Sequence, residues 1–255
     1  MTRGIGIRTW RNTYLTGSRP LFDLVIRDAH VDRVLAATGE RPPRTRSQRA
    51  RGAARRLRPW FWPSITDAES WAVSSEAVGW QPSAYIVKEP RRLLRRLLDT
   101  TSREQSVLDL GCNSGSHLDL MRKAGFQVLY GVDAGREALA LFSSTFPETY
   151  ELADVEHDLF QRYLRRRPDR SVDVLHSNGA TLELVHPSFP IVSEICRVTR
   201  HRVLVDIQER GHSYPRDYIA QFEHHGFRLV YCERPVDLVE GTSLLEFERI
   251  RPATG

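Results

Sequence analysis

From residue 105 onward, short apolar runs alternate with amphipathic segments. The apolar runs have the length of buried strands and lie at residues 107–110, 127–133, 149–152, 172–177 and 201–207. Between them, apolar residues recur as on helices with one buried face, at residues 136–142, 156–165, 191–198 and 216–224, with a further helix starting near residue 116. This alternation predicts an α/β fold with a parallel sheet covered by helices on both faces. Runs at residues 227–233 and 243–250 predict a final antiparallel pair of strands.

The N-terminal part of the chain divides by composition. Residues 1–40 form an extension in which residues 21–26 fit either a strand or the start of a helix that reaches Ala37. Residues 41–63 predict an arginine-rich linker, since residues 41–58 hold eight arginines and no acid. The net charge of +5 therefore belongs to this segment, and the rest of the chain is net acidic. Residues 64–104 predict a lid or docking segment with a first helix, and residues 105–251 the main domain.

The first predicted helix begins near Pro90, a residue suited to the first turn. Its apolar face consists of Leu93, Leu94, Leu97 and Leu98. The opposite face consists of Arg91, Arg92, Arg95 and Arg96, which we expect to be solvated.

Composition also indicates the compartment. No apolar run approaches the length of a membrane span, and the first residues do not lead into the apolar core of a signal peptide. The three cysteines are odd in number and lack metal-ligand spacing, which favours reduced thiols. We therefore expect a soluble, cytoplasmic protein.

A glycine turn follows the first strand of the main domain. Gly111 and Gly115 allow a ligand to approach the backbone and the next helix closely, so we expect N–H groups of this turn to face a ligand. Asp109 lies inside the apolar strand, where a charge needs a specific partner. The second strand ends at Asp133, at the distance past the turn where nucleotide-binding α/β folds hold a ribose diol.

The pattern Asp109, Gly111, Gly115 resembles the first motif of class I S-adenosylmethionine-dependent methyltransferases, over roughly residues 80–250. Asn113 replaces a glycine common in that motif, and the spacing does not fit a dinucleotide fingerprint. The resemblance implies a seven-stranded Rossmann-like sheet and S-adenosyl-L-methionine as cofactor, with S-adenosyl-L-homocysteine as product. It implies cofactor contacts from Asp109, Gly111, Cys112, Asn113, Gly115, Asp133, Ala134, Asp154, Val155, Ser177 and Asn178. Asp158 replaces Asp154 as the adenine contact if the third strand ends later than residue 154.

Methyl transfer to a hydroxyl or protonated amine requires a proton acceptor, and histidine titrates near neutral pH. The histidines nearest the predicted mouth of the sheet are His212, His186 and His176. Candidate substrate contacts come from the lid and from the loop after the fifth strand, and they are Trp80, Tyr85, Arg210, Tyr214 and Arg216. No carboxylate cluster with metal spacing follows the fourth strand, so we expect no magnesium requirement.

These observations predict methyl transfer to oxygen or nitrogen of a small or medium polar acceptor, for which a sugar or secondary metabolite is a candidate. One alternative is an RNA methyltransferase that uses residues 41–62 as a nucleic-acid tether, whose activity would fall steeply with salt. Another is a non-catalytic regulator that binds the cofactor without turnover. We expect residues 1–58 to be dispensable for cofactor binding.

Overall fold

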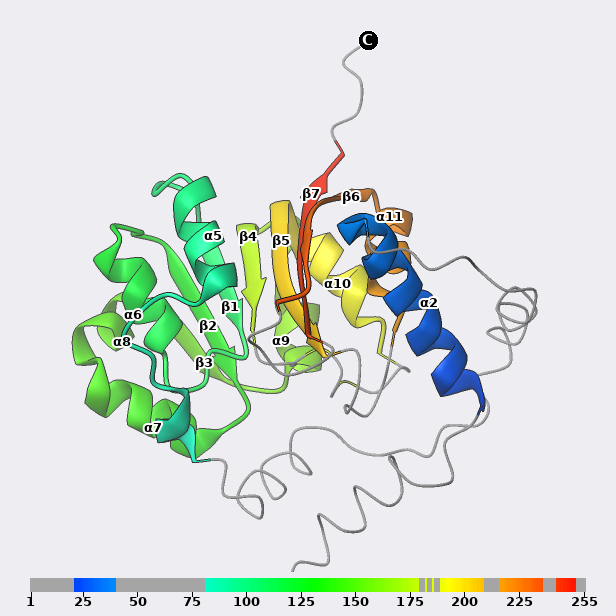
Figure 1. The fold of residues 1–255 in the computed structure, drawn as a ribbon. Coiled ribbons are helices and arrows are strands. Elements are labelled where there is room, and N and C mark those ends of the chain that lie inside the picture. The colour runs from blue at the N-terminus through cyan, green and yellow to red at the C-terminus, as the bar shows by residue number, and fades with distance from the viewer. Residues whose placement is uncertain are drawn as a thin grey trace, which may run out of the picture.

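The computed structural model describes residues 21–39, 81–178, 182, 185, 189–208, 216–235 and 242–250. Its centre is a seven-stranded sheet in the order β3-β2-β1-β4-β5-β7-β6 (Figure 1). The strands are β1 (Val107–Leu110), β2 (Leu129–Asp133), β3 (Asp154–His157), β4 (Val172–Ser177), β5 (Thr199–Gln208), β6 (Phe227–Glu233) and β7 (Thr242–Arg249). β7 pairs antiparallel with β5 and β6, while β1 to β5 pair in parallel. The predicted α/β fold and its final antiparallel pair are confirmed.

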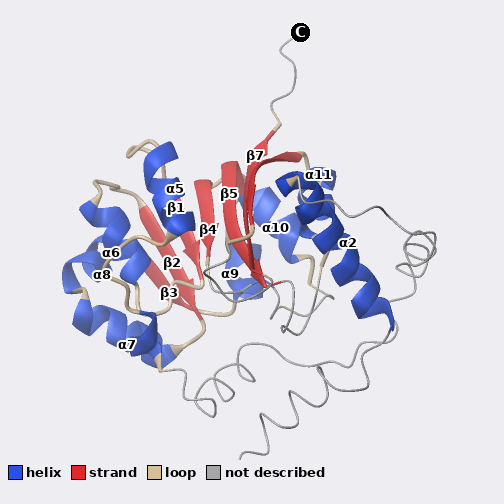
Figure 2. Ribbon diagram, viewed as in Figure 1, coloured by secondary structure: helices blue, strands red, loops and turns tan. Residues whose placement is uncertain are grey.

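Helices cover both faces of this sheet (Figure 2). They are α2 (Leu21–Thr38), the 3-10 helix η2 (Pro82–Tyr85), α5 (Arg92–Thr100), α6 (Ser116–Lys123), α7 (Arg136–Thr145), α8 (Pro147–Leu152), α9 (Phe160–Arg166), α10 (Ile191–Val198) and α11 (Tyr218–His224). Neighbouring strand residues point to opposite layers. Val107 and Val174 pack with α5, α6 and α7, whereas Leu108 and Leu175 pack with α9, α10 and α11. Among the described helices, none combines the length and apolarity needed to cross a bilayer.

The prediction of a third strand at residues 149–152 is wrong. These residues belong to α8, which starts with Pro147 in its first turn and carries Glu148 at the favourable helix N-terminus. Thr149 is buried and its hydroxyl donates to Asp119 at 2.7 Å. The strand begins later, at Asp154, and ends at His157. This shift moves the carboxyl end of β3, and with it the polar residues of the site.

The ambiguous run at residues 21–26 is part of the helix α2. This helix packs against α11 and β6, with Val34 fully buried in the same core as the central strands. Arg33 forms an ion pair with Asp217 at 3.1 Å. The N-terminal extension therefore contributes a helix to the core, and removing residues 1–58 would uncover the surface that this helix covers.

We expect His30 of α2 to make stability depend on pH. Its side chain is 2% exposed, and burial lowers its pKa from 6.5 to about 4. Between these values the unfolded chain binds a proton that the folded chain excludes, so the free energy of unfolding falls as pH falls. From pH 7 to 5 the loss due to His30 is about 2 kcal/mol. Denaturant unfolding at both pH values should show that His30→Leu removes this loss.

His224→Leu is the matched control, because it makes the same substitution at an exposed histidine at the end of α11 and should retain the loss due to His30. Equal pH dependence in the wild type and in His30→Leu would refute the role of His30.

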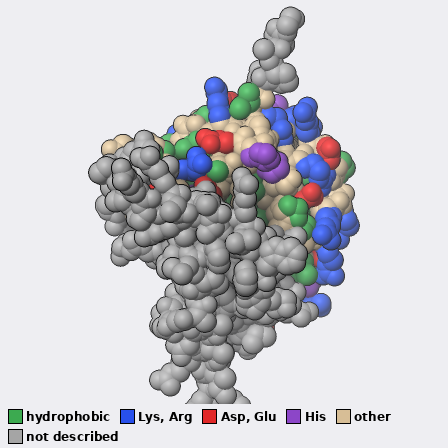
Figure 3. All heavy atoms as spheres, turned by 90° about the vertical axis from the view of Figure 1, so that its right-hand side faces the viewer, with side chains coloured by type: hydrophobic (Ala, Val, Ile, Leu, Met, Phe, Trp, Pro, Cys, Tyr) green, Lys and Arg blue, Asp and Glu red, His purple; other side chains and the backbone are tan. Residues whose placement is uncertain are grey.

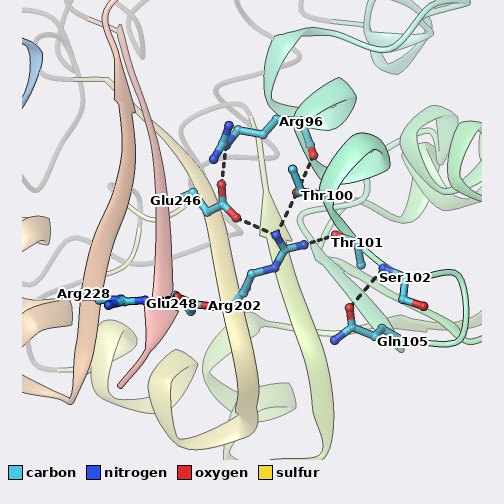
Figure 4. A network of polar contacts seen from close by, with 9 residues as sticks. All are labelled: Arg96, Thr100, Thr101, Ser102, Gln105, Arg202, Arg228, Glu246 and Glu248. Atoms are coloured by element: carbon cyan, nitrogen blue, oxygen red, sulfur yellow. Dashed lines mark hydrogen bonds and ion pairs between the residues drawn. The ribbon is translucent and has the colours of Figure 1, made fainter. Parts of the chain in front are cut away.

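Ion pairs attach α5 to the sheet. Arg92 is exposed, as expected, whereas Arg96 is partly buried, so the expectation that these arginines are solvated is wrong for Arg96. Arg92 pairs with Glu233 at 2.7 Å, and Arg96 pairs with Glu246, whose side chain is 2% exposed. From the sheet, Arg202 donates to the same Glu246 at 2.9 Å and to Thr100 of α5 at 2.8 Å (Figure 4). Glu246 is therefore a buried acid shared by two arginines, one from the helix and one from β5.

Candidate active site

The backbone of the glycine turn after β1 adopts a conformation that few side chains allow. Gly111, Asn113 and Gly115 have φ values of 87°, 47° and 72°, all in the left-handed region. A Cβ atom at Gly115 would lie 2.2 Å from the Phe142 ring of α7, so only glycine fits there. Asn113 tolerates its conformation because asparagine makes local bonds, and its Oδ1 accepts from the N–H of Ser114 at 2.7 Å. The departure from glycine at residue 113 is therefore compatible with the turn.

The N–H groups of this turn donate inside the protein. Gly111 and Cys112 donate to the Val132 carbonyl at 2.9 and 3.1 Å. The residues with internally bonded N–H groups are Gly111, Cys112, Asn113, Ser114 and Gly115. The expectation that these N–H groups face a ligand is therefore wrong. An anionic group at this turn would find none of these five donors available.

Asp133 ends β2 beside the turn. Its carboxylate accepts from the N–H of Asn113 at 2.9 Å and from the N–H of Gly135 at 2.7 Å. A carboxylate offers about four acceptor sites, so two N–H donors leave capacity for a ligand hydroxyl. Burial raises the pKa of Asp133, and the two N–H groups oppose that rise. Ala134 follows, and its carbonyl lies 3.1 Å from Nε2 of His157.

The predicted adenine contact moves from Asp154 to Asp158. Asp154 pairs with Tyr130, whereas His157 pairs with Asp133, so Asp154 and Val155 lie toward the opposite end of β3 from Asp133. Three residues of a strand span about 10 Å, which separates the Asp154 backbone from the carboxyl edge. Asp158 follows the strand directly, and its N–H donates to the Asp133 carbonyl at 3.1 Å. The error follows from placing the third strand at residues 149–152.

Asp158 is a buried acid, 8% exposed, with cationic partners. Arg162 and Arg166 of α9 pair with its two oxygens at 2.8 and 2.6 Å. Burial alone would raise the pKa of Asp158, but the N–H of Leu159 and the two arginines hold it below its usual value. Its carboxylate therefore stays ionised as an acceptor.

Asp109 has the specific partner that its buried position required. Asp109 of β1 pairs in register with His176 of β4, and Nδ1 of His176 lies 2.8 Å from Oδ1 of Asp109. Both side chains are buried, and Nε2 of His176 has no hydrogen-bond partner in the described structure. The ring of His117, the second residue of α6, lies edge-on to that of His176 with centroids 5.3 Å apart. Burial lowers the pKa of His117 to about 4, so this ring is neutral at pH 7.

Some of the other predicted cofactor contacts, from β4 and the turn, have side chains that are already bonded or packed within the protein. Ser177 Oγ donates to the Leu110 carbonyl at 2.8 Å and joins the ends of β4 and β1, and Asn178 follows it at the carboxyl edge. The Cys112 side chain is buried against Gly131, and burial raises the pKa of its thiol well above the usual value. Cys112 can therefore meet a ligand through its backbone only.

Two of the predicted substrate contacts are described. Tyr85 is half-buried at the end of η2, and its carbonyl accepts from Ser116 Oγ at 3.1 Å, so η2 lies against the start of α6. Arg216 is buried and donates to the carbonyls of Leu182 and Val185, at 3.0 and 2.5 Å. Arg216 thus holds the chain after β4 in place, which corrects its assignment to the substrate. The candidates outside the described residues are Trp80, His186, Arg210, His212 and Tyr214.

Sequence and structure comparisons agree on the type of domain. Residues 83–192 match the family described as Methyltransferase domain. No curated protein matches the chain significantly. The fold is shared with many solved structures. One is a Burkholderia thailandensis 1,6-didemethyltoxoflavin-N1-methyltransferase with bound 1,6-didemethyltoxoflavin and S-adenosylhomocysteine, at TM-score 0.55 and 14% identity over 74% of this chain and 93% of that one.

Two other solved structures have similar scores. A TehB-like SAM-dependent methyltransferase from Corynebacterium glutamicum aligns at TM-score 0.54 and 18% identity, over 71% of this chain and all of its own. Magnesium protoporphyrin IX methyltransferase from Synechocystis, with bound SAM, aligns at TM-score 0.53 and 13% identity, over 92% of this chain and all of its own. At these identities the likeness is one of fold.

Proposed function

We propose that the chain is a class I S-adenosylmethionine-dependent methyltransferase, which transfers the methyl group of S-adenosyl-L-methionine to oxygen or nitrogen of a small or medium polar acceptor. S-adenosyl-L-homocysteine is the second product. Asp133 binds the ribose diol, the Asp158 carboxylate accepts from the adenine amino group, and the turn from Gly111 to Gly115 contacts the methionine portion.

The observation that carries this proposal is that the N–H groups of the glycine turn are already hydrogen-bonded within the protein. A dinucleotide presents an anionic pyrophosphate, which such folds bind with N–H donors of the glycine turn. Here those five N–H groups already donate inside the protein. S-adenosylmethionine has no pyrophosphate. Its sulfonium and ammonium are cationic and suit the neighbouring Asp133 carboxylate, and its single carboxylate needs donors other than these five N–H groups. The electrostatics of the turn therefore favour the methyl donor over a nicotinamide dinucleotide.

Methyl transfer requires no covalent bond between the protein and the substrates. When bound, the cofactor supplies a methyl carbon already activated by positive sulfur. The residues of the chain align the acceptor in line with that carbon, exclude water and receive the acceptor's proton. The nucleophile's lone pair forms the bond to carbon as the electrons of the carbon–sulfur bond pass to sulfur.

A small acceptor is supported by two structural relatives, which act on a toxoflavin precursor and on magnesium protoporphyrin IX according to their names. The arginines of residues 41–58 keep RNA methylation as the second candidate. In the described part of the face drawn in Figure 3, basic and acidic side chains are intermixed. Binding along the phosphates of an RNA backbone favours a surface of positive charge. Activity that falls steeply between 50 and 200 mM salt, about 10³-fold or more, would favour RNA.

Asp133→Ala tests the ribose assignment. The substitution removes a charged acceptor and should weaken S-adenosylhomocysteine binding by about 1.5–3 kcal/mol, or roughly 10- to 150-fold. Isothermal titration calorimetry on the full chain measures this difference. Asp154→Ala is the control, because this exposed acid lies at the other end of β3 and its loss should leave the affinity unchanged. Unchanged affinity in a folded Asp133→Ala protein would contradict the assignment.

A further inference from the structure

Three metal-ligating side chains from separate elements converge beside the glycine turn. Asp109 comes from β1, His176 from β4 and His117 from the start of α6. Each offers one ligand atom, and these atoms all lie within 4.8 Å of one another. Within the described ranges, no other three histidine, cysteine or acidic side chains converge in this way.

The cluster has features that its fold role does not explain. Asp109 is 2% exposed and His176 is fully buried, so the carboxylate is a charge withdrawn from water. Nε2 of His176 is a buried polar atom without a hydrogen bond among the described residues. His117 is half-buried, so the cluster has an accessible side.

We propose that Asp109, His117 and His176 bind one divalent transition-metal ion. Two imidazoles and a carboxylate suit Zn²⁺, Fe²⁺, Co²⁺ or Ni²⁺, whereas Mg²⁺ and Ca²⁺ prefer oxygen ligands. The positive ion compensates the buried Asp109 charge. Three protein ligands also leave an open coordination position, as in catalytic zinc sites.

The observed spacing is close to that of a loaded site. Bonds of about 2.0–2.2 Å from each ligand atom to a shared ion place the ligand atoms about 3–3.5 Å apart. The three ligand atoms all lie within 4.8 Å of one another, so a contraction of about 1.5 Å brings them to these distances.

The role of the ion rests on the proposed function. Asp109 lies two residues before Gly111 and pairs in register with His176, so the cluster lies near the carboxyl ends of β1 and β4. Asp109, His117 and His176 would hold the ion there, and the ion would lower the pKa of an acceptor hydroxyl that binds to it.

Metal binding itself is tested without any acceptor. The full-length chain is stripped with a chelator and titrated with ZnCl₂, and with CoCl₂ to record d–d absorption. We expect one equivalent of metal, bound in competition with a chelating dye. His117→Asn and His176→Asn should each weaken binding by at least about 100-fold. His201→Asn and His224→Asn are matched controls outside the cluster and should bind as the wild type does.

Circular dichroism identifies variants that fail to fold, and half-buried His117 keeps the test decisive if buried His176 cannot be replaced. One equivalent of zinc that persists in folded His117→Asn, or that disappears only in His186→Asn or His212→Asn, overturns the proposal. Absence of metal binding in the wild type does so too. Calorimetry with S-adenosylhomocysteine on the metal-free chain separates the two proposals, since retained binding without metal affinity refutes only this one.

Discussion

Replacing Gly115 by alanine is expected to destabilise the protein by about 2–5 kcal/mol and to abolish the cofactor site. A non-glycine residue in the left-handed region costs about 1–2 kcal/mol, and forcing a methyl group into a packed core costs about 1–3 kcal/mol more. Both apply here, because φ is 72° and the new Cβ would lie 2.2 Å from the buried Phe142 ring. Denaturant unfolding of the wild type and of Gly115→Ala measures the loss.

Gly226→Ala separates the two causes. Gly226, in the turn before β6, has a φ of 78°, but a Cβ there would meet nothing within 4 Å. Its substitution should therefore cost only the conformational part, about 1–2 kcal/mol. Equal losses in the two variants would show that the contact between the turn and Phe142 does not restrict residue 115.

Glu246→Ala should destabilise the protein by about 2–4 kcal/mol. Breaking a buried ion pair costs about 3–5 kcal/mol, and the loss is smaller here because Arg96 is 30% exposed and can turn toward solvent. The variant leaves Arg96 and Arg202 together between α5 and the sheet without their shared acid. Chemical denaturation gives the difference in the free energy of unfolding.

Glu248→Ala provides the comparison on the same strand. Glu248 pairs with Arg228 at 2.7 Å, and both side chains are exposed (Figure 4). A surface pair of this kind contributes less than about 1 kcal/mol. If Glu246→Ala costs no more than Glu248→Ala, α5 is held to the sheet by its leucines rather than by the ion pairs.

Much of the fold could be predicted from local patterns in the sequence. Local signals predicted the strands that contain Asp109 and Asp133 and the turn between Gly111 and Gly115. Each of these signals, a buried run, a glycine or an acid, lies within a few neighbouring residues. The third strand could not, since the short segment from Pro147 to Leu152 fits a strand by its apolar residues and a helix by its first turn. That one error placed the expected adenine contact at Asp154 rather than at Asp158, which follows β3 directly.

Other features of the site depend on contacts between distant parts of the chain. His117 and His176 are 59 positions apart and meet Asp109 only because β1 and β4 are neighbours and α6 follows the turn. No metal-ligand spacing along the sequence predicts such a group. Arg216 was predicted to contact the substrate because it lies in a loop after a strand. Its buried guanidinium instead donates to the carbonyls of Leu182 and Val185. Burial of a polar group by tertiary packing has no local signature.

The central claim is that the crevice at the carboxyl ends of β1 and β2 binds an adenosyl sulfonium cofactor. Calorimetric titration of the wild-type full chain with S-adenosylhomocysteine, and separately with NAD⁺, tests it most directly. We expect one equivalent of S-adenosylhomocysteine to bind and NAD⁺ to give no heat of binding. Binding of NAD⁺ that S-adenosylhomocysteine does not displace, or no binding of S-adenosylhomocysteine at all, would contradict the claim.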